Sequence, residues 1–156
     1  MTHMRIEIVG HRNLGRRLRA IGRLAEVTVR RAIVESAMRI EHEAKLSIRR
    51  NPRRGVTYVR HDPERRRRAS APGDPPATDT GVLARNIVHV IDADGLGASV
   101  ESRAAHSRFL EFGTARMAAR PFLRPAFESQ IGPSMKRIAD AVRIAIARAA
   151  PAGAAD

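Results

Sequence analysis

The hydrophobic pattern in the first third of the chain changes its period once. From Met4 to Val9 apolar and polar residues alternate, which predicts a short strand with one buried face. From Leu14 to about Arg49 apolar residues recur at three- and four-residue steps, which predicts one long amphipathic helix or two helices bent near Gly22. This length exceeds what a small domain needs to cover its core. We therefore expect part of the helix to pack on another subunit.

The pattern is least regular between residues 53 and 80. Gly55–Arg60 predicts a strand, and a run of arginines follows it. Three prolines and a glycine between Ser70 and Ala77 then exclude both a helix and the interior of a sheet. We expect an extended Pro-rich loop or arm here, ended by a turn at Thr80-Gly81.

Regular elements return in the second half of the chain. Val82–Ile91 and Ala98–Glu101 predict two strands, and residues 92–95 between them have the composition of a hairpin turn. His106–Phe112 is a third strand candidate. From about Pro125 to Ala149 the spacing is helical again, and Pro125 suits the first position of a helix.

Grouped strands with helices on either side are typical of the α+β class. We predict a single domain over residues 1–150, in which a long N-terminal helix and a C-terminal helix flank a small antiparallel or mixed sheet. The 156 residues suffice for one such core, and residues 151–156 are expected to form a flexible tail. Because no apolar run approaches the ~20 residues that cross a bilayer, we expect a soluble protein with no membrane contact that is intracellular when made.

The composition adds a strong positive charge. The formal net charge is +13, and all but two of the 29 basic residues are arginines. Such a surface favours nucleic acid or an acidic protein face, although a genome rich in G and C would also raise the arginine and alanine content. The run Arg65, Arg66, Arg67 and Arg68 has no interleaved aromatic residues for base stacking. We favour a solvated loop there, and a contact with DNA or an acidic partner is the alternative.

Patterns for catalysis and for metal binding are missing from the sequence. His42-Glu43 begins a zinc-protease pattern, but Leu46 occupies the position of the second histidine. The chain has no cysteine, its six histidines are scattered, and Gly95-Leu96-Gly97 lacks the third glycine of a dinucleotide site. We therefore predict no enzymatic activity, no catalytic residues, no metal and no cofactor.

All four phenylalanines lie between His106 and Ser129, in a segment that prolines stiffen. Stiff backbone loses little entropy on binding, and aromatic and arginine side chains dominate interface energies. We therefore predict a subunit interface in this segment and the Pro-rich loop, formed by Phe109, Glu111, Phe112, Thr114, Arg120, Phe122, Arg124, Pro72, Pro75 and Pro76. The alternative is that the rings form the core. We expect both: Phe122 and Phe127 in the core, and some of Arg120, Arg124 and Glu111 paired so that the loop is fixed.

Two motifs carry a resemblance to a known family. The first is LEFGT at residues 110–114 followed by MAARPFLRPA at 117–126, and the second is SAPGDPP at 70–76 followed by TGVL at 80–83. With the order of the helices, they resemble the bacteriophage gene-product-ten-like tail-component and neck protein family over nearly the whole chain. The twenty-residue stretch from Phe109 to Glu128 is the more specific of the two.

The resemblance implies a structural virion protein of a long-tailed phage, prophage or gene transfer agent, present in the host cytoplasm during assembly. It implies a six- or twelve-fold homo-oligomeric ring at the head–tail neck or tail top, which joins head and tail around the DNA channel. The implied partners are a head-closure or connector ring, a tail-terminator or tail-tube ring, and packaged DNA. A tail terminator or completion subunit, or a basic nucleic-acid-binding module, is the alternative. Since DNA must slide through such a ring, we expect most arginines to face proteins or the exterior.

Overall fold

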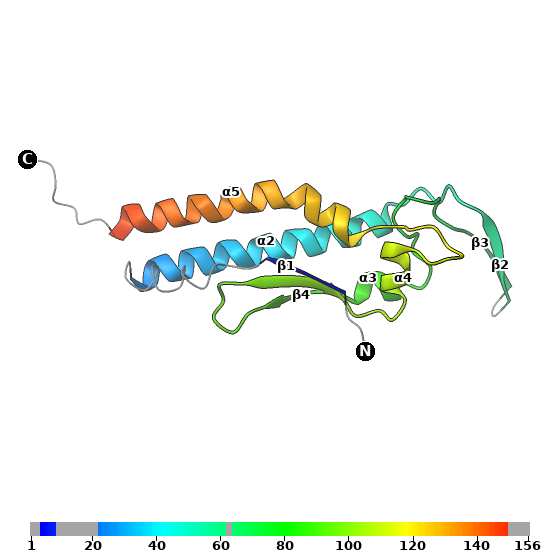
Figure 1. Ribbon diagram of the computed structural model, residues 1–156, viewed down its shortest axis with the longest axis horizontal. Helices are drawn as coiled ribbons and strands as arrows, with labels where there is room; N and C mark the ends of the chain where they lie inside the picture. The colour runs from blue at the N-terminus through cyan, green and yellow to red at the C-terminus, as the bar shows by residue number, and fades with distance from the viewer. Residues whose placement is uncertain (1–3, 9–21, 62–63, 150–156) are drawn as a thin grey trace, which may run out of the picture.

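The computed structural model of the chain describes residues 4–8, 22–61 and 64–149. Within these residues two long helices accompany a three-stranded sheet, a separate two-stranded sheet and two short helices (Figure 1). The elements in chain order are β1 (Met4–Ile8), α2 (Arg23–Arg49), β2 (Thr57–His61), β3 (Glu64–Arg68), α3 (Val82–Arg85), β4 (Ile87–Ile91), β5 (Ala98–Ser102), α4 (Ser107–Phe112) and α5 (Leu123–Ala149). The predicted α+β class is confirmed.

The long helices α2 and α5 lie antiparallel and side by side along the longest axis of the molecule (Figure 1). The buried apolar residues of α2 recur mostly at three- and four-residue steps, and half of them are alanines: Ala25, Val29, Ala32, Ile33, Ala37, Ile40, Ala44 and Ile48. Short side chains such as these allow two helix axes to approach closely. A polar contact joins the helices inside this seam, where Arg137 Nη1 donates to the buried Ser36 hydroxyl at 3.0 Å.

The three-stranded sheet has the order β1-β5-β4, and both pairings are antiparallel. Central β5 pairs Ala98 with Ile8 of β1 and with Ile91 of β4. The predicted hairpin turn after β4 is confirmed: the Asp92 N–H donates to the Gly97 carbonyl at 3.0 Å. In Figure 1 α2 lies between this sheet and α5, so that both layers share α2 as their core helix.

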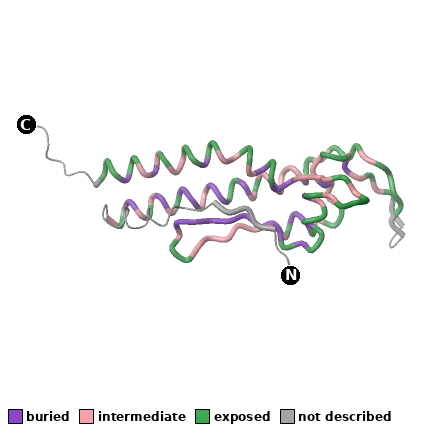
Figure 2. Tube along the Cα trace, in the orientation of Figure 1, coloured by how far each residue is buried: buried purple, intermediate pink, exposed green. Residues whose placement is uncertain are grey.

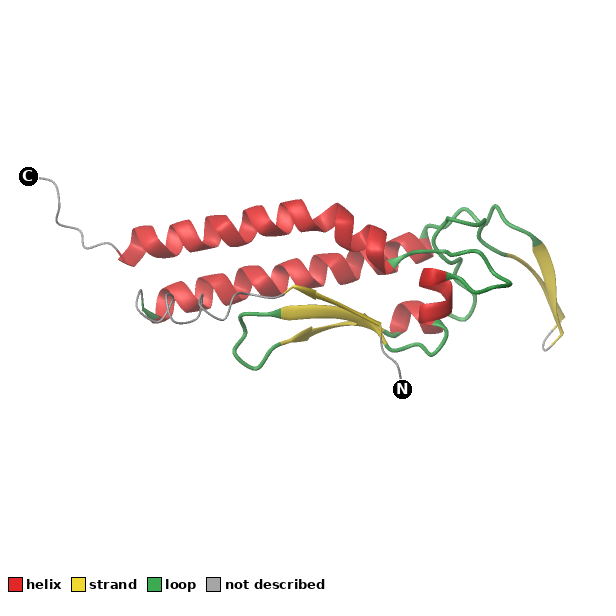
Figure 3. Ribbon diagram, viewed as in Figure 1, coloured by secondary structure: helices red, strands yellow, loops and turns green. Residues whose placement is uncertain are grey.

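The two-stranded sheet stands apart from this body. Strands β2 and β3 form an antiparallel hairpin, with Thr57 opposite Arg68 and His61 opposite Glu64. Figure 3 shows this hairpin extending beyond the end of the two long helices. Figure 2 shows buried residues along α2 and in the sheet of the body, whereas the described part of the hairpin is mostly exposed. We call β2 and β3 together the hairpin arm.

Three sequence predictions need correction. His106–Phe112 was expected as a strand, but Ser107–Phe112 is helix α4, because its buried residues follow a helical step. Val82–Ile91 was expected as one strand, yet its first four residues form α3 and only Ile87–Ile91 is extended. The arginine run 65–68 was favoured as a loop and lies in β3. The first eight residues of the predicted N-terminal helix, Leu14 to Ile21, lie outside the described residues.

Candidate functional site

The short helix α4 places two phenylalanines on the surface. Phe109 and Phe112 are three residues apart, so that their side chains leave the same face of the helix. They are 54% and 68% exposed, respectively. With Arg108, Gly113 and Thr114 they line an open depression of about 660 Å³. We call Phe109 and Phe112 the exposed aromatic pair.

The turn after α4 has a fixed shape. Gly113 has φ 75°, and a Cβ atom there would lie 2.7 Å from the Met117 carbonyl oxygen and 2.8 Å from the Ala119 nitrogen. Its own N–H donates to the Phe109 carbonyl at 2.9 Å. Thr114 and Met117 then exchange two backbone hydrogen bonds of 2.8 and 3.2 Å. The turn therefore requires glycine at residue 113 and holds the exposed aromatic pair at its entrance.

The buried carboxylate of Glu111, on the opposite side of α4, caps the start of α5. Its side chain accepts backbone hydrogen bonds from Phe122 (2.9 Å), Leu123 (3.0 Å) and Arg124 (2.8 Å). These are N–H groups that have no partner within the helix, and a negative charge at this end also suits the helix dipole. The next residue, Pro125, has no N–H to satisfy. One carboxylate and one proline thus complete the N-terminus of α5.

This cap gives a physical reason for both parts of the first motif, LEFGT and the RPFLRP within MAARPFLRPA. The glutamate of LEFGT supplies the acceptor, and RPFLRP supplies three donors followed by a proline. A further hydrogen bond of 2.7 Å, from the Arg120 N–H to the Leu110 carbonyl, holds the two segments together. Phe122 is fully buried beneath them, and Phe127 packs against the core, as predicted for both.

The other charged residues of the segment differ in their surroundings. Arg124 is exposed and bonds Glu128 at 2.8 Å; this hydrogen bond and the Glu128 charge raise the pKa of Arg124. Arg120 is half-buried, and its Nε is buried with no hydrogen-bond acceptor among the described residues. Glu111 therefore fixes the loop through backbone N–H groups and not through an arginine side chain.

The Pro-rich loop folds back on the body. The Gly73 N–H donates to the Ala119 carbonyl at 2.9 Å, which joins this loop to the segment after α4. The Thr78 hydroxyl donates to the Ile48 carbonyl at 3.2 Å near the end of α2. Among the predicted interface prolines, Pro72 is exposed, Pro75 half-buried and Pro76 buried.

The arginine run has mixed surroundings on the hairpin arm. Arg66 and Arg68 are exposed, and Arg68 Nε donates to the Gly55 carbonyl at 2.9 Å. Arg67 is half-buried and forms an ion pair with Asp79 at 3.3 Å. Arg65 lies in β3 opposite Arg60, and its side chain lies outside what the structure describes.

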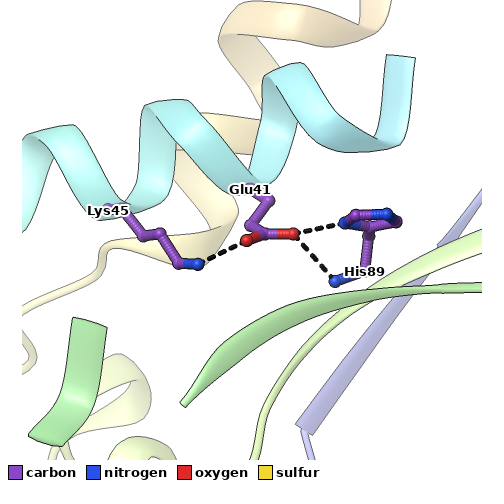
Figure 4. A network of polar contacts seen from close by, with 3 residues as sticks. All are labelled: Glu41, Lys45 and His89. Carbon is purple, nitrogen blue, oxygen red and sulfur yellow. Dashed lines mark hydrogen bonds and ion pairs between the residues drawn. The ribbon is translucent and has the colours of Figure 1, made fainter. Parts of the chain in front are cut away.

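A polar network that sequence reasoning missed joins α2 to the sheet (Figure 4). The Glu41 carboxylate accepts hydrogen bonds from the Lys45 ammonium, from His89 Nδ1 and, at 3.0 Å, from the His89 backbone N–H. Burial alone would raise the pKa of Glu41, but the hydrogen bonds and charges of Lys45 and His89 outweigh it and lower that pKa. The four-residue spacing of Glu41 and Lys45 on a helix is a signal in the sequence for their ion pair. The contact with His89 on β4 could not be predicted, because only the fold brings the two residues together.

The contacts of Glu41 with Lys45 and His89 hold α2 against β4, and we call these three residues the Glu41 clamp. Within the described residues no three His, Cys, Asp or Glu side chains are grouped so that they could hold a metal ion. In the same part of the chain no helix combines the length and apolar character needed to cross a bilayer.

Comparison with protein families gives one match. A family model described as "Bacteriophage HK97-gp10, putative tail-component" matches residues 12–113, which is more than half of the chain. The matched segment ends at Gly113, the glycine of the turn after α4, and includes Glu41 and its distant partner His89. A search of curated proteins and a search of solved structures found no match.

Proposed function

Because the chain belongs to the bacteriophage HK97-gp10 tail-component family, a family of structural phage proteins, we propose that it is a ring-forming subunit at the head–tail neck or tail top. Copies of the chain would surround the DNA channel and join the head to the tail without catalysing a reaction. The neighbours in this proposal are a connector-side ring and a tail-side ring.

The observation that carries the proposal is the exposed aromatic pair. Two phenylalanines with more than half of their surface in solvent lie on a helix whose opposite side is buried and hydrogen-bonded. Aromatic side chains on a fixed support contribute strongly to protein interfaces, because little conformational entropy is lost on binding. This arrangement favours a contact with another protein chain over a role within the subunit.

A ring also needs two different faces on each subunit, because a head-to-tail contact repeats around the axis. The exposed aromatic pair, together with the exposed Pro72 of the loop that is hydrogen-bonded to the segment after α4, supplies one candidate face. The hairpin arm, with Val56 80% exposed at its base and Val59 exposed within it, supplies a second. A two-stranded sheet is marginally stable by itself, so the arm is suited to pack on another chain.

One observation favours a second function. The hairpin arm carries consecutive arginines on a projecting two-stranded ribbon, and ribbons of this kind fit the major groove of DNA. The alternative is therefore a basic nucleic-acid-binding module.

Substitution of the exposed aromatic pair tests the ring proposal in the particle. We expect Phe112→Ala to fold as the wild type, because the ring is 68% exposed, and to accumulate full heads without tails. Electron microscopy of lysates counts joined and unjoined particles, and circular dichroism checks the fold. Ile146→Ala is the control, since it truncates an apolar side chain that is 51% exposed near the far end of α5. Normal joining in the double variant Phe109→Ala, Phe112→Ala would contradict the proposal.

A further inference from the structure

A cleft lies where the hairpin arm meets the body. It has a volume of about 420 Å³ and is bounded by the base of the arm, the Pro-rich loop, α3 and α4. Four guanidinium groups line it, those of Arg53, Arg67, Arg68 and Arg120. Its lining also includes aliphatic side chains, among them Ile48, Leu83 and Leu110. We call it the arginine cleft.

The charge of the arginine cleft is unbalanced. Among the described residues that line it, Asp79 is the single carboxylate, and it pairs with Arg67 at 3.3 Å. Two of the other three arginines are held by neutral groups: Arg53 Nη2 donates to the Thr78 carbonyl at 3.0 Å, and Arg68 Nε to the Gly55 carbonyl at 2.9 Å. These bonds orient the guanidinium groups and leave their positive charge uncompensated.

The backbone of Arg53 has an unusual conformation that a local hydrogen bond holds in place. It has φ 51°, the one positive φ of a non-glycine residue in the described chain, and its N–H donates to Asn51 Oδ1 at 2.7 Å. Left-handed backbone is unfavourable for a side chain of this size. The loop thus holds an arginine at the rim of the cleft in a backbone conformation that glycine or asparagine would adopt more readily.

Three buried polar atoms of lining residues have no hydrogen-bond partner in the described structure; one of them, Arg67 Nε, has the ion pair with Asp79, and the other two have neither kind of partner. These two are the hydroxyl of Ser70, a residue that is 2% exposed, and Nε of Arg120. A buried donor without an acceptor is destabilising, and more so when the group is charged. A ligand that brings acceptor oxygens into the arginine cleft removes this cost.

We propose that the arginine cleft binds a carboxylate-bearing peptide segment with apolar neighbours, supplied by an adjacent virion protein. The carboxylate forms charge-assisted hydrogen bonds with Arg68 and Arg120, whose forked donors match its two oxygens. The aliphatic lining accepts the apolar neighbours of the acidic residue. That the partner is a virion protein rests on the proposed function, whereas the chemistry of the cleft does not.

The shape of the cleft favours such a segment over DNA. A volume of about 420 Å³ accommodates a few side chains and excludes a duplex, whose phosphates would contact only the rim. Phosphate contacts also gain nothing from an aliphatic lining, while an amphipathic peptide does.

Fluorescence anisotropy with the full-length protein tests the proposal. The probe is a labelled nonapeptide of alternating Glu and Leu, and the comparison probes are the Gln–Leu peptide and a 12-base-pair duplex. We expect the Glu–Leu peptide to bind, and Arg68→Gln to weaken it about tenfold, as the loss of a charge-assisted pair in a partly dry site would. Ser70→Ala should weaken it by a smaller factor. Arg148→Gln is the matched control, because it removes the same charge from an exposed residue in the last turn of α5.

Several outcomes would overturn the proposal. Equal weakening by Arg148→Gln and Arg68→Gln means that diffuse charge attracts the peptide. Equal binding of the Gln–Leu peptide means that the carboxylate is not recognised. Tighter binding of the duplex, with loss in Arg68→Gln, identifies a nucleic-acid surface instead. None of these results bears on the head–tail joining test with the exposed aromatic pair, so the two proposals fail separately.

Discussion

At the residue scale, the carboxylate of Glu111 joins helix α4 to the start of α5. A single buried carboxylate receives three backbone N–H groups at the start of a 27-residue helix. The same residue lies in the helix that carries the exposed aromatic pair. The support for the predicted interface and the start of α5 therefore depend on one side chain.

The Glu111 cap gives the first prediction at this scale. Glu111→Ala leaves the N–H groups of Phe122, Leu123 and Arg124 without their acceptor, and we expect the free energy of unfolding to fall by about 3 kcal/mol. Glu111→Gln keeps one acceptor oxygen and should lose less. Urea denaturation followed by circular dichroism measures both. An alanine variant as stable as the wild type would show that the cap does not hold α5.

The Glu41 clamp gives a pH-dependent prediction. The folded pKa of Glu41 is lowered from its usual value of 4.5, so its stabilising effect is complete above that pH and is lost as the pH falls through the lower folded value. We expect Glu41→Gln to cost about 1 kcal/mol at neutral pH, after solvent screening of a partly exposed group. Below pH 4.5 the melting temperatures of variant and wild type should converge. A constant difference down to pH 3 would contradict this linkage.

At the element scale, the hairpin arm is separable from the body. The described residues of β2 and β3 contribute nothing to the buried core, which α2, α5, α3 and the three-stranded sheet share with the segment around α4. Polar contacts join it to the body, as in the ion pair of Arg67 with Asp79.

Replacing residues 57–68 by a short Gly-Ser linker should therefore leave the body folded. We expect the melting temperature to change by less than about 4 °C, the shift that 1 kcal/mol causes in a domain of this size. Differential scanning calorimetry measures it. A cooperative loss of folding would show that the arm supports the core and is not an appendage.

For single elements, the sequence was informative where a hydrophobic period extends over several helical turns or where a loop has the residue composition of a defined turn. The two long helices and the β4–β5 turn were predicted because their patterns are long or specific. Helix α4 was not, since six residues fit both a helical and an alternating pattern. The hairpin arm was only half predicted, because strand β3 is almost entirely arginine and shows no hydrophobic alternation.

The candidate site was predicted less well than the fold. The motif around Glu111 was identified, but its role as a helix cap depends on residues 11 to 13 positions away, a distance that only the fold brings to bonding range. Likewise Phe109 and Phe122 are alike in sequence, yet one is 54% exposed and the other fully buried. Which rings face solvent is decided by tertiary packing.

At the scale of the whole molecule, the charge of +13 determines how copies of the chain interact. Identical subunits with this charge repel one another at low salt, so we expect the proposed ring to form more readily with added salt or with an acidic partner. The arginine cleft is one place where such a partner would compensate charge within the subunit.

The same charge predicts how the protein binds DNA. If most arginines face proteins, duplex DNA should bind weakly at low salt and dissociate near 0.15 M salt, because the contact is diffuse. Filter binding over a salt series measures the slope. Tight binding at physiological salt with a steep slope would overturn this expectation and favour the nucleic-acid module.

The paired long helices also set a length. Each has 27 residues, which at 1.5 Å per residue is about 40 Å, and the hairpin arm projects from one end while the last turn of α5 lies at the other (Figure 1). In the proposed assembly, partners bound at these two ends would be separated by the length of the helix pair. Inserting one helical turn into both helices would lengthen the pair by about 5.4 Å, and in the proposed ring it would move apart any partners bound at the two ends by the same distance.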